Sequence, residues 1–171
     1  MSRCDECGFD YEAADDPEIP RLLESEVAEI CALLSQTEDA KLRIRTQPTV
    51  WSPLEYACHV RDVLLVQRDR ALLALVEDTP SFIPMYRDER VVNAGYGFER
   101  VAEVSEELRV AARLISKLAA GLTREQLARG CIYNFPEPAE RDVGWVFRHT
   151  LHEVVHHKKD ISDGLASSGV A

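Results

Sequence analysis

A chain of 171 residues is long enough to bury the core of one domain without disulfide or metal staples. Hydrophobic residues make up 46% and charged residues 29%, the balance of a soluble globular protein. Acidic residues outnumber basic ones by 30 to 20, and the resulting net charge of −10 argues against a nucleic-acid binder because phosphate backbones would be repelled.

The compartment is predicted from what the sequence lacks. Residues 1–10 show neither a basic region nor an apolar region of a signal peptide, and the apolar runs are too short to cross a membrane. Five cysteines at irregular spacing do not form a disulfide framework. We therefore expect a cytoplasmic protein that neither enters nor spans a membrane.

The first half of the chain predicts two long helices. Residues 17–36 carry apolar side chains at helical spacing, and Asp16 before a proline is a suitable cap. A second helix begins at Ser52-Pro53-Leu54-Glu55, where Ser52 and Glu55 form a capping box, and it continues to about residue 77. Residues 79–97 then form a connection whose length suggests that it covers something.

The second half predicts two more long helices and no series of strands. The third helix starts near residue 98 or 101 and stops at Gly121, and a short turn over 123–129 follows. Residues 130–141 read as a loop with an extended segment at 131–135. Asp142 caps a fourth helix that runs to about Ser162, and the tail after Gly164 is expected to fray. The prediction is an all-α four-helix bundle over residues 17–171, preceded by an N-terminal tail over residues 1–16.

The fourth helix carries an unusual density of histidines. Four of the five histidines lie between positions 149 and 157. His152 and His156 are four residues apart, so their rings stack on one face, as a metal clip requires. His149 shares that face within about 60°, whereas His157 points elsewhere. A metal site explains this stripe better than packing does, because buried imidazoles need partners.

Residues 152–156 also match H-E-x-x-H, the helix motif of zinc peptidases, in which the glutamate is a general base. The peptidase motif needs a further ligand downstream, but Lys159 and Ser162 occupy the places of the extended motif, and no glutamate follows Glu153. We therefore expect Glu153 to face solvent or to support a ligand, and we look upstream for the third ligand.

Outside the cluster the only histidine is His59, early in the second helix. His59, His152 and His156 together would leave open coordination positions, as in catalytic sites. Zinc is the default metal for such ligands, and nickel or iron would also fit.

Two segments of the chain resemble one known family. Residues 51–62 (WSPLEYACHVRD) are similar to the entry of the second helix of DinB/YfiT-like proteins. Residues 151–161 (LHEVVHHKKDI) are similar to their fourth-helix motif, H-x-x-x-H-H followed by a polar residue and isoleucine. The resemblance extends over roughly residues 22–161.

This resemblance implies a four-helix bundle in which His59, His152 and His156 hold a metal. Some relatives are transferases or isomerases that use mycothiol or bacillithiol, including mycothiol-dependent maleylpyruvate isomerase, and family members are often dimers. It therefore implies a small-molecule substrate, a low-molecular-weight thiol as co-substrate and a homodimer.

The chain departs from the family pattern at two places. Residues 158–160 are Lys-Lys-Asp in place of the frequent Arg-Gly-Gln, which puts substrate analogies in doubt. The N-terminal tail also carries Cys4-Asp5-Glu6-Cys7, half of a zinc knuckle with no second pair of cysteines. Three readings stay open for this pair: a metal site shared across a dimer, a redox pair, or a flexible tail with two exposed thiols.

Four further residues are candidates for supporting roles. His149 is a candidate fourth ligand, a group that supports a ligand, or a proton carrier. Asp62, one turn after His59, is a candidate to orient that histidine or a bound water. Arg141 and Arg148 are candidates to receive an anionic thiol cofactor. The alternative to an enzyme is a metal-stabilised binding or stress-response protein without turnover, and a third hypothesis assigns the histidines to packing alone.

Overall fold

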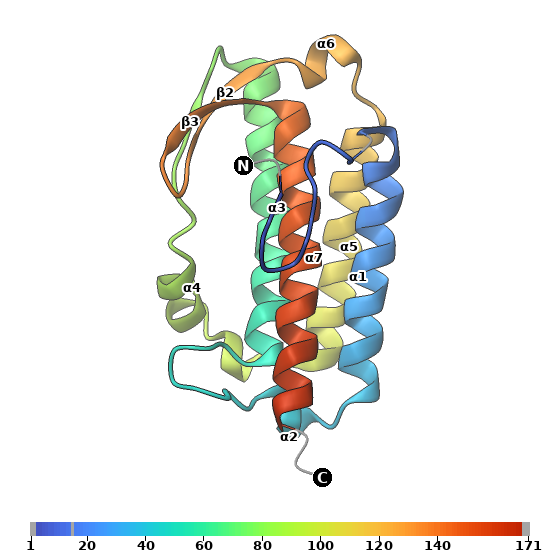
Figure 1. The fold of residues 1–171 in the computed structure, drawn as a ribbon, viewed down its shortest axis with the longest axis vertical. Helices are drawn as coiled ribbons and strands as arrows, with labels where there is room; N and C mark the ends of the chain where they lie inside the picture. Colours follow the sequence, from blue (N-terminus) through green and yellow to red (C-terminus); the bar gives the residue numbers. More distant parts are fainter. Residues whose placement is uncertain (1–2, 15, 169–171) are drawn as a thin grey trace.

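A computed structural model describes residues 3–14 and 16–168 (Figure 1). Four long helices, α1 (Ile19–Gln36), α3 (Pro53–Val76), α5 (Val101–Ala120) and α7 (Val143–Ser168), run along the molecule and form the predicted four-helix bundle. Within residues 3–14 and 16–168, no helix is both long and apolar enough to cross a membrane.

The helices pack in an order that differs from their order in the chain. α1 packs against α5 and α7, and α3 packs against the same two helices. The order around the bundle is therefore α1–α5–α3–α7, with α1 diagonal to α3. This arrangement makes α3 and α7 direct neighbours, and these are the two helices that carry all five histidines.

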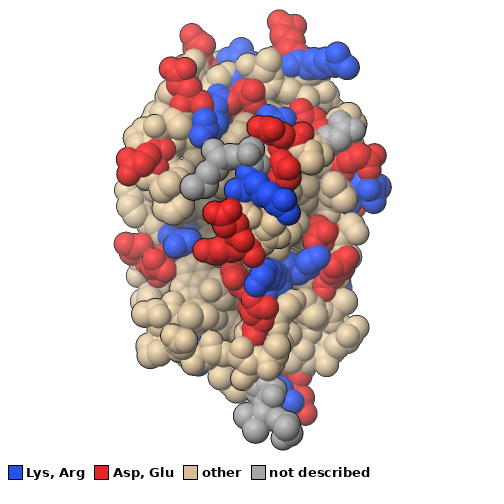
Figure 2. All heavy atoms as spheres, in the orientation of Figure 1, with Lys and Arg blue, Asp and Glu red and all other residues tan. Residues whose placement is uncertain are grey.

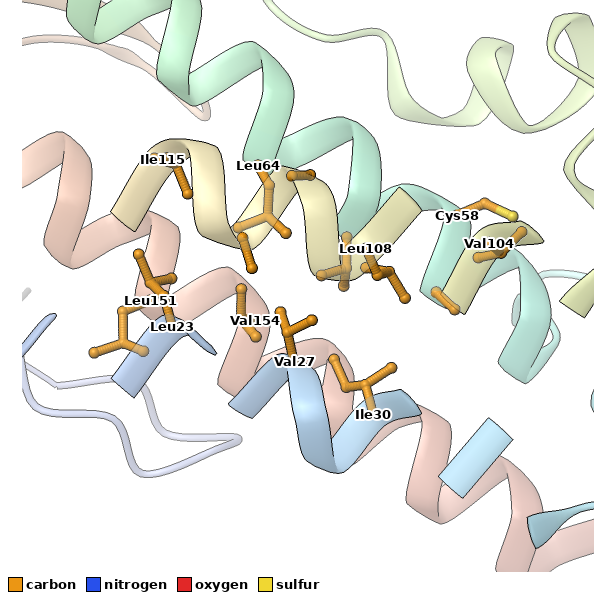
Figure 3. Packing of buried hydrophobic residues seen from close by; sticks show 14 of the residues in the cluster. Leu23, Val27, Ile30, Cys58, Leu64, Val104, Leu108, Ile115, Leu151 and Val154 are labelled. Atoms are coloured by element: carbon orange, nitrogen blue, oxygen red, sulfur yellow. The ribbon is translucent and has the colours of Figure 1, made fainter. Parts of the chain in front are cut away.

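The core lies between the facing stripes of the four helices (Figure 3). Leu23, Val27 and Ile30 of α1 face the apolar side chains of the other helices, which include Leu64, Leu108 and Val154. The remaining cysteines, Cys31, Cys58 and Cys131, are buried, as small apolar residues usually are.

The start of α3 is fixed by the predicted capping box. Glu55 N–H donates to Ser52 Oγ at 3.3 Å, and Ser52 N–H donates to Glu55 Oε2 at 2.7 Å. Arg45 also donates to both Glu55 oxygens, at 2.6 and 2.8 Å. The buried Glu55 carboxylate thus ties the loop before α3 to its first turn.

Short elements accompany the long helices. The 3₁₀ turn η1 (Asp16–Glu18) precedes α1, and the connections contain α2 (Asp39–Leu42), α4 (Arg87–Asn93), η2 (Tyr96–Phe98) and α6 (Arg124–Leu127). The turn predicted after α5 is the short helix α6, and Thr123 and Gln126 form a second capping box at its start. α4 and η2 lie in the long connection predicted over residues 79–97.

A small sheet of three strands is present where the sequence predicts one extended segment and no series of strands. β2 (Gly130–Asn134) pairs antiparallel with β3 (Pro138–Asp142), and β1 (Ser81–Phe82) pairs parallel with β2. The predicted extended segment at 131–135 is therefore the central strand. The sequence did not predict β1 or β3, because β1 has only two residues and β3 is mostly polar, so neither shows a clear alternation of apolar and polar residues.

The ends of two predicted helices also differ from the structure. α1 begins at Ile19 after the 3₁₀ turn η1, and Asp16 accepts a hydrogen bond from Arg148 at 2.5 Å rather than capping the helix. α7 continues to Ser168, beyond the predicted end near Ser162, so residues 165–168 are helical; residues 169–171 lie outside the described residues. Asp142 does cap α7, since Trp145 N–H donates to Asp142 Oδ1 at 2.6 Å.

The N-terminal segment, residues 3–14, lies across α7 (Figure 1). Arg3 and Asp10 form an antiparallel bridge, so the segment folds back on itself. Phe9 and Tyr11 both contact the ring of His152, at centroid distances of 5.5 and 5.4 Å. The segment thus packs against the histidine-rich helix.

Charged side chains are mixed on the surface. On the face shown in Figure 2, acidic and basic groups alternate over its centre and upper part, and much of its lower part is uncharged. Ion pairs across helices contribute to this mixture; Lys158 of α7, for example, pairs with Glu26 and Glu29 of α1.

We predict that Glu55→Ala lowers the free energy of unfolding by about 1–3 kcal/mol, because it removes a helix cap and leaves the Arg45 guanidinium without its carboxylate. Glu55→Gln is the matched control, since glutamine can still close the capping box but cannot form the ion pair. Urea denaturation at pH 7 measures both variants. Equal stability of Glu55→Ala and the parent protein would contradict the assignment.

The same residue predicts a pH dependence. Burial raises the pKa of Glu55, but Arg45 and Ser52 outweigh it and hold the pKa below its ordinary value of 4.5. A carboxylate with a lowered folded pKa contributes stability above the unfolded value and loses it as the pH falls through the folded value. Glu55→Gln should therefore flatten the loss of stability below about pH 4.5, measured by urea midpoints at stepped pH.

Candidate metal centre

The register of α7 decides which histidines enter the bundle. Val143, Phe147, Thr150, Val154, His157 and Ile161 recur at alternating spacings of four and three, and all six are buried. That spacing is the seam of a packed helix. His157 therefore lies in the seam that faces the bundle interior, while His152 and His156 lie beside it.

The seam brings His157 to His59 of α3. The two rings lie edge to face with centroids 4.9 Å apart. Glu153, one turn before His157, completes the group, with Oε2 at 3.5 Å from His157 Nε2. One ligand atom from each of His59, Glu153 and His157 lies within 4.8 Å of the others. We call these three residues the inner group.

His157 is held in one orientation by an acidic neighbour. Its Nδ1 lies 2.8 Å from Asp160 Oδ2, so Nδ1–H donates to that carboxylate and Nε2 faces the inner group. Burial opposes charge on this ring, but Asp160 and Glu153 outweigh it and raise the pKa of His157 to about 9. The two carboxylates therefore stabilise a positive charge at the inner group.

His59 has the opposite electrostatic character. Burial, reinforced by the charge of His157, lowers the pKa of His59 to about 3, so its imidazole is neutral at physiological pH. Its Nδ1 is buried and has no hydrogen-bond partner among the described residues. Buried polar atoms are rarely left unpaired, and a neutral imidazole nitrogen without a partner is a ready metal ligand.

These residues fit a divalent metal ion. Two imidazoles and one carboxylate are a ligand set of catalytic zinc sites, in which a further position stays open for water or substrate. The Asp160 contact to Nδ1 of His157 is the carboxylate contact that commonly orients a metal-binding histidine. The donor set is therefore that of a catalytic rather than a structural metal site.

The predicted ligands are divided between two places in the structure. His59 is in the inner group, but His152 and His156 lie with Cys4 and Cys7 of the N-terminal segment. Across residues 3–14 and 16–168, no group with ligand atoms within 4.8 Å joins His59 to His152 or His156. The physical reason is the rotation of α7, which turns the neighbouring stripe, Glu153 and His157, toward α3.

The placement of His157 differs from the sequence-based expectation, and that of Glu153 agrees with it in part. His157 was set aside because it leaves the face of His152 and His156, yet its place in the seam was visible in the alternating spacing. Of the two expectations for Glu153, exposure to solvent or support of a ligand, the structure agrees with the second at His152 and adds a contact to His157, since the carboxylate lies 3.5 Å from a nitrogen of each ring.

His149 and Asp62 have structural partners of their own. His149 stacks on Trp145 at 4.7 Å, its Nδ1 is 2.8 Å from the Tyr11 hydroxyl, and burial lowers its pKa to about 4. Asp62 accepts a hydrogen bond from the Tyr96 hydroxyl at 2.6 Å and pairs with Arg61 and Arg90. The Asp62 carboxylate thus holds the connection that contains α4 and η2.

The two arginines proposed for an anionic cofactor are also engaged. Arg148 pairs with Asp16 and Asp142, and Arg141 lies over the ring of Trp145 at 4.9 Å. Sequence analysis missed Arg87, an exposed residue whose guanidinium lies 5.9 Å from the centre of the Trp51 ring. Trp51 in turn contacts His59 at 5.1 Å, and the positive charge of Arg87 is among those that lower the pKa of His59.

Comparison with known proteins agrees with this fold. The chain is similar to YfiT from Bacillus subtilis, described as a probable metal-dependent hydrolase with an unusual four-helix bundle topology. The TM-score is 0.83 at 17% identity, over 91% of this chain and 89% of that one. It is also similar to the mycothiol-dependent maleylpyruvate isomerase, with a TM-score of 0.71 at 13% identity; the match covers 88% of this chain and 62% of the isomerase.

At these identities the two structures establish the fold and not the activity. No curated protein matches the chain in sequence. The model of the DinB superfamily matches residues 22–161, which include the whole inner group. The chain therefore belongs to the DinB superfamily.

Proposed function

We propose that the protein is a metal-dependent enzyme in which His59, Glu153 and His157 hold one divalent ion. The observation that carries this proposal is the convergence of three suitable donors from two helices, one of them an unpaired buried nitrogen. Zinc suits two imidazoles and a carboxylate, and nickel or iron would bind the same set.

The ion would lower the pKa of a bound thiol or water and present it as a nucleophile. The co-substrate we favour is a low-molecular-weight thiol of the mycothiol or bacillithiol kind. The similarity to a mycothiol-dependent isomerase supports the thiol, and the similarity to a probable hydrolase supports water as the second candidate.

The chain's own residues would prepare this chemistry. Asp160 accepts the Nδ1 proton of His157, so that Nε2, after losing its own proton to the solvent, would be the nitrogen that binds the ion. Trp51 and Tyr56 pack against His59 and His157, at 5.1 and 5.4 Å, and keep water from that side of the group. Arg87, over Trp51, would receive an anionic group of the thiol or the substrate.

We predict that His59→Ala removes one equivalent of bound metal, since an inner group with two ligands binds a divalent ion far more weakly. Cys58→Ala is the matched control, because Cys58 is the buried neighbour on α3 and its thiol faces Tyr96 O rather than the inner group. Elemental analysis of both purified proteins gives the ratio. Full retention of metal by His59→Ala would contradict the ligand assignment.

We also predict that the metal-loaded protein accelerates conjugation of mycothiol or bacillithiol to an electrophile, and that His59→Ala abolishes the acceleration. Loss of free thiol is measured against the uncatalysed rate, with hydrolysis of an activated ester as the assay for water. If metal removal lowers only the melting temperature and both reactions run at the uncatalysed rate, the alternative of a metal-stabilised protein without turnover holds.

A further inference from the structure

A second group of metal-binding residues lies outside the inner group. Cys4 and Cys7 of the N-terminal segment meet His152 and His156 of α7, and one ligand atom from each of the four lies within 4.8 Å of the others. Cys4 Sγ lies 3.7 Å from His156 Nδ1. The cysteine pair and the histidine pair are distant in sequence, since Cys4 and His156 are 152 residues apart. Only the fold brings the two pairs together.

The backbone around the cysteines forms a tight turn. Gly8 N–H donates to Cys4 O at 2.9 Å, and Cys4 N–H donates to Phe9 O at 2.8 Å. Gly8 has φ of +75°, which a residue with a side chain rarely adopts. This turn places the two sulfurs on one side of the segment, facing α7.

Both histidines have a nitrogen free for this group. His156 Nε2 lies 3.3 Å from Glu6 Oε2 and 3.8 Å from Asp160 Oδ2, which leaves Nδ1 for the sulfur side. His152 Nδ1 lies 3.5 Å from Glu153 Oε1. Both ring nitrogens of His152 are buried, and neither has a hydrogen-bond partner in the part of the chain that the structure describes. Carboxylate oxygens thus lie near one nitrogen of each histidine, on the side where such groups commonly orient metal-binding histidines.

We propose that Cys4, Cys7, His152 and His156 form a closed zinc site that fastens the N-terminal segment to α7. A tetrahedral zinc ion with bonds of about 2.0–2.3 Å needs ligand atoms roughly 3.3–3.8 Å apart, and the group is already close to that size. Two cysteines and two histidines fill all four positions, which is the mark of a structural site. The site shares no ligand with the inner group and does not depend on the proposed enzymatic function.

The site has a consequence for the neighbouring surface. Phe9 and Tyr11 follow the cysteines and pack on His152, and the Tyr11 hydroxyl contacts His149. A metal ion that fixes Cys4 and Cys7 therefore also keeps these aromatic rings over α7. Loss of the ion would release residues 3–14 while leaving the core of the four long helices intact.

Cobalt substitution tests the site separately from the inner group. The reduced full-length protein is stripped of metal with a chelator and titrated with Co²⁺ while absorption is recorded. A thiolate-to-cobalt charge-transfer band in the near ultraviolet requires a cysteine ligand, which the inner group lacks. In His59→Ala, whose inner group no longer competes for the ion, we expect this band to saturate at one equivalent of cobalt and to disappear when zinc is added.

Variants assign the band to residues. Cys7→Ser should abolish it, as should His152→Ala, whereas Cys131→Ala, which removes a buried thiol elsewhere, should leave it unchanged. His59→Ala should also keep the band while losing the other equivalent of metal, so that failure of either site is recognised separately. Circular dichroism confirms that each variant is folded, and Cys7→Ser is the decisive one because its residue lies outside the bundle core.

Hydrogen exchange provides an independent measurement. Zinc added to the stripped protein should slow amide exchange in residues 3–14 of the parent protein but not of Cys7→Ser. A reduced protein that gives no charge-transfer band overturns the proposal. A band that persists in Cys7→Ser, or unchanged exchange of residues 3–14 on zinc addition, also overturns it.

Discussion

The structure depends most on the seam between α3 and α7, in which a histidine occupies a position that packing would give to an apolar residue. His157 is buried between Val154 and Ile161, where an unpaired imidazole would be costly. Asp160 and Glu153 meet that cost from the same helix, and His59 faces the ring from the neighbouring helix. The need to satisfy one buried ring thus gathers the donors of the inner group.

The order of the helices around the bundle makes this seam possible. α1 and α3 are consecutive long helices, yet they lie diagonally, and α3 packs on α7 instead. The connections carry the charged contacts that hold this order. Arg148 on Asp16 joins the start of α1 to α7, and Asp62 binds the Tyr96 hydroxyl beside α4. Charged residues that look available for catalysis in the sequence are therefore part of the scaffold.

α7 presents two adjacent stripes of donors with different surroundings. Glu153 and His157 face α3, where they form a group of three donors together with His59. Three donors would leave coordination positions open on a metal ion. His152 and His156 face the N-terminal segment, where two cysteines complete a set of four. Glu153 lies between the stripes, with one oxygen toward His152 and the other toward His157. One helix thus carries the donors of both proposed sites, the open one and the closed one, on stripes separated by a rotation of about 100° between neighbouring residues.

The sequence by itself determined the four long helices, because apolar spacing and capping residues such as Ser52 and Glu55 are local signals. It also gathered the candidate metal donors on α7 and at His59. It did not determine the small sheet, whose strands are too short for a pattern, or the partner of each histidine. Either of two stripes about 100° apart on α7 could face α3 until packing fixes the rotation of the helix. Only the tertiary structure shows which stripe faces α3. The meeting of Cys4 and Cys7 with α7 was likewise decided by the fold alone, since no local signal relates residues so distant in the chain.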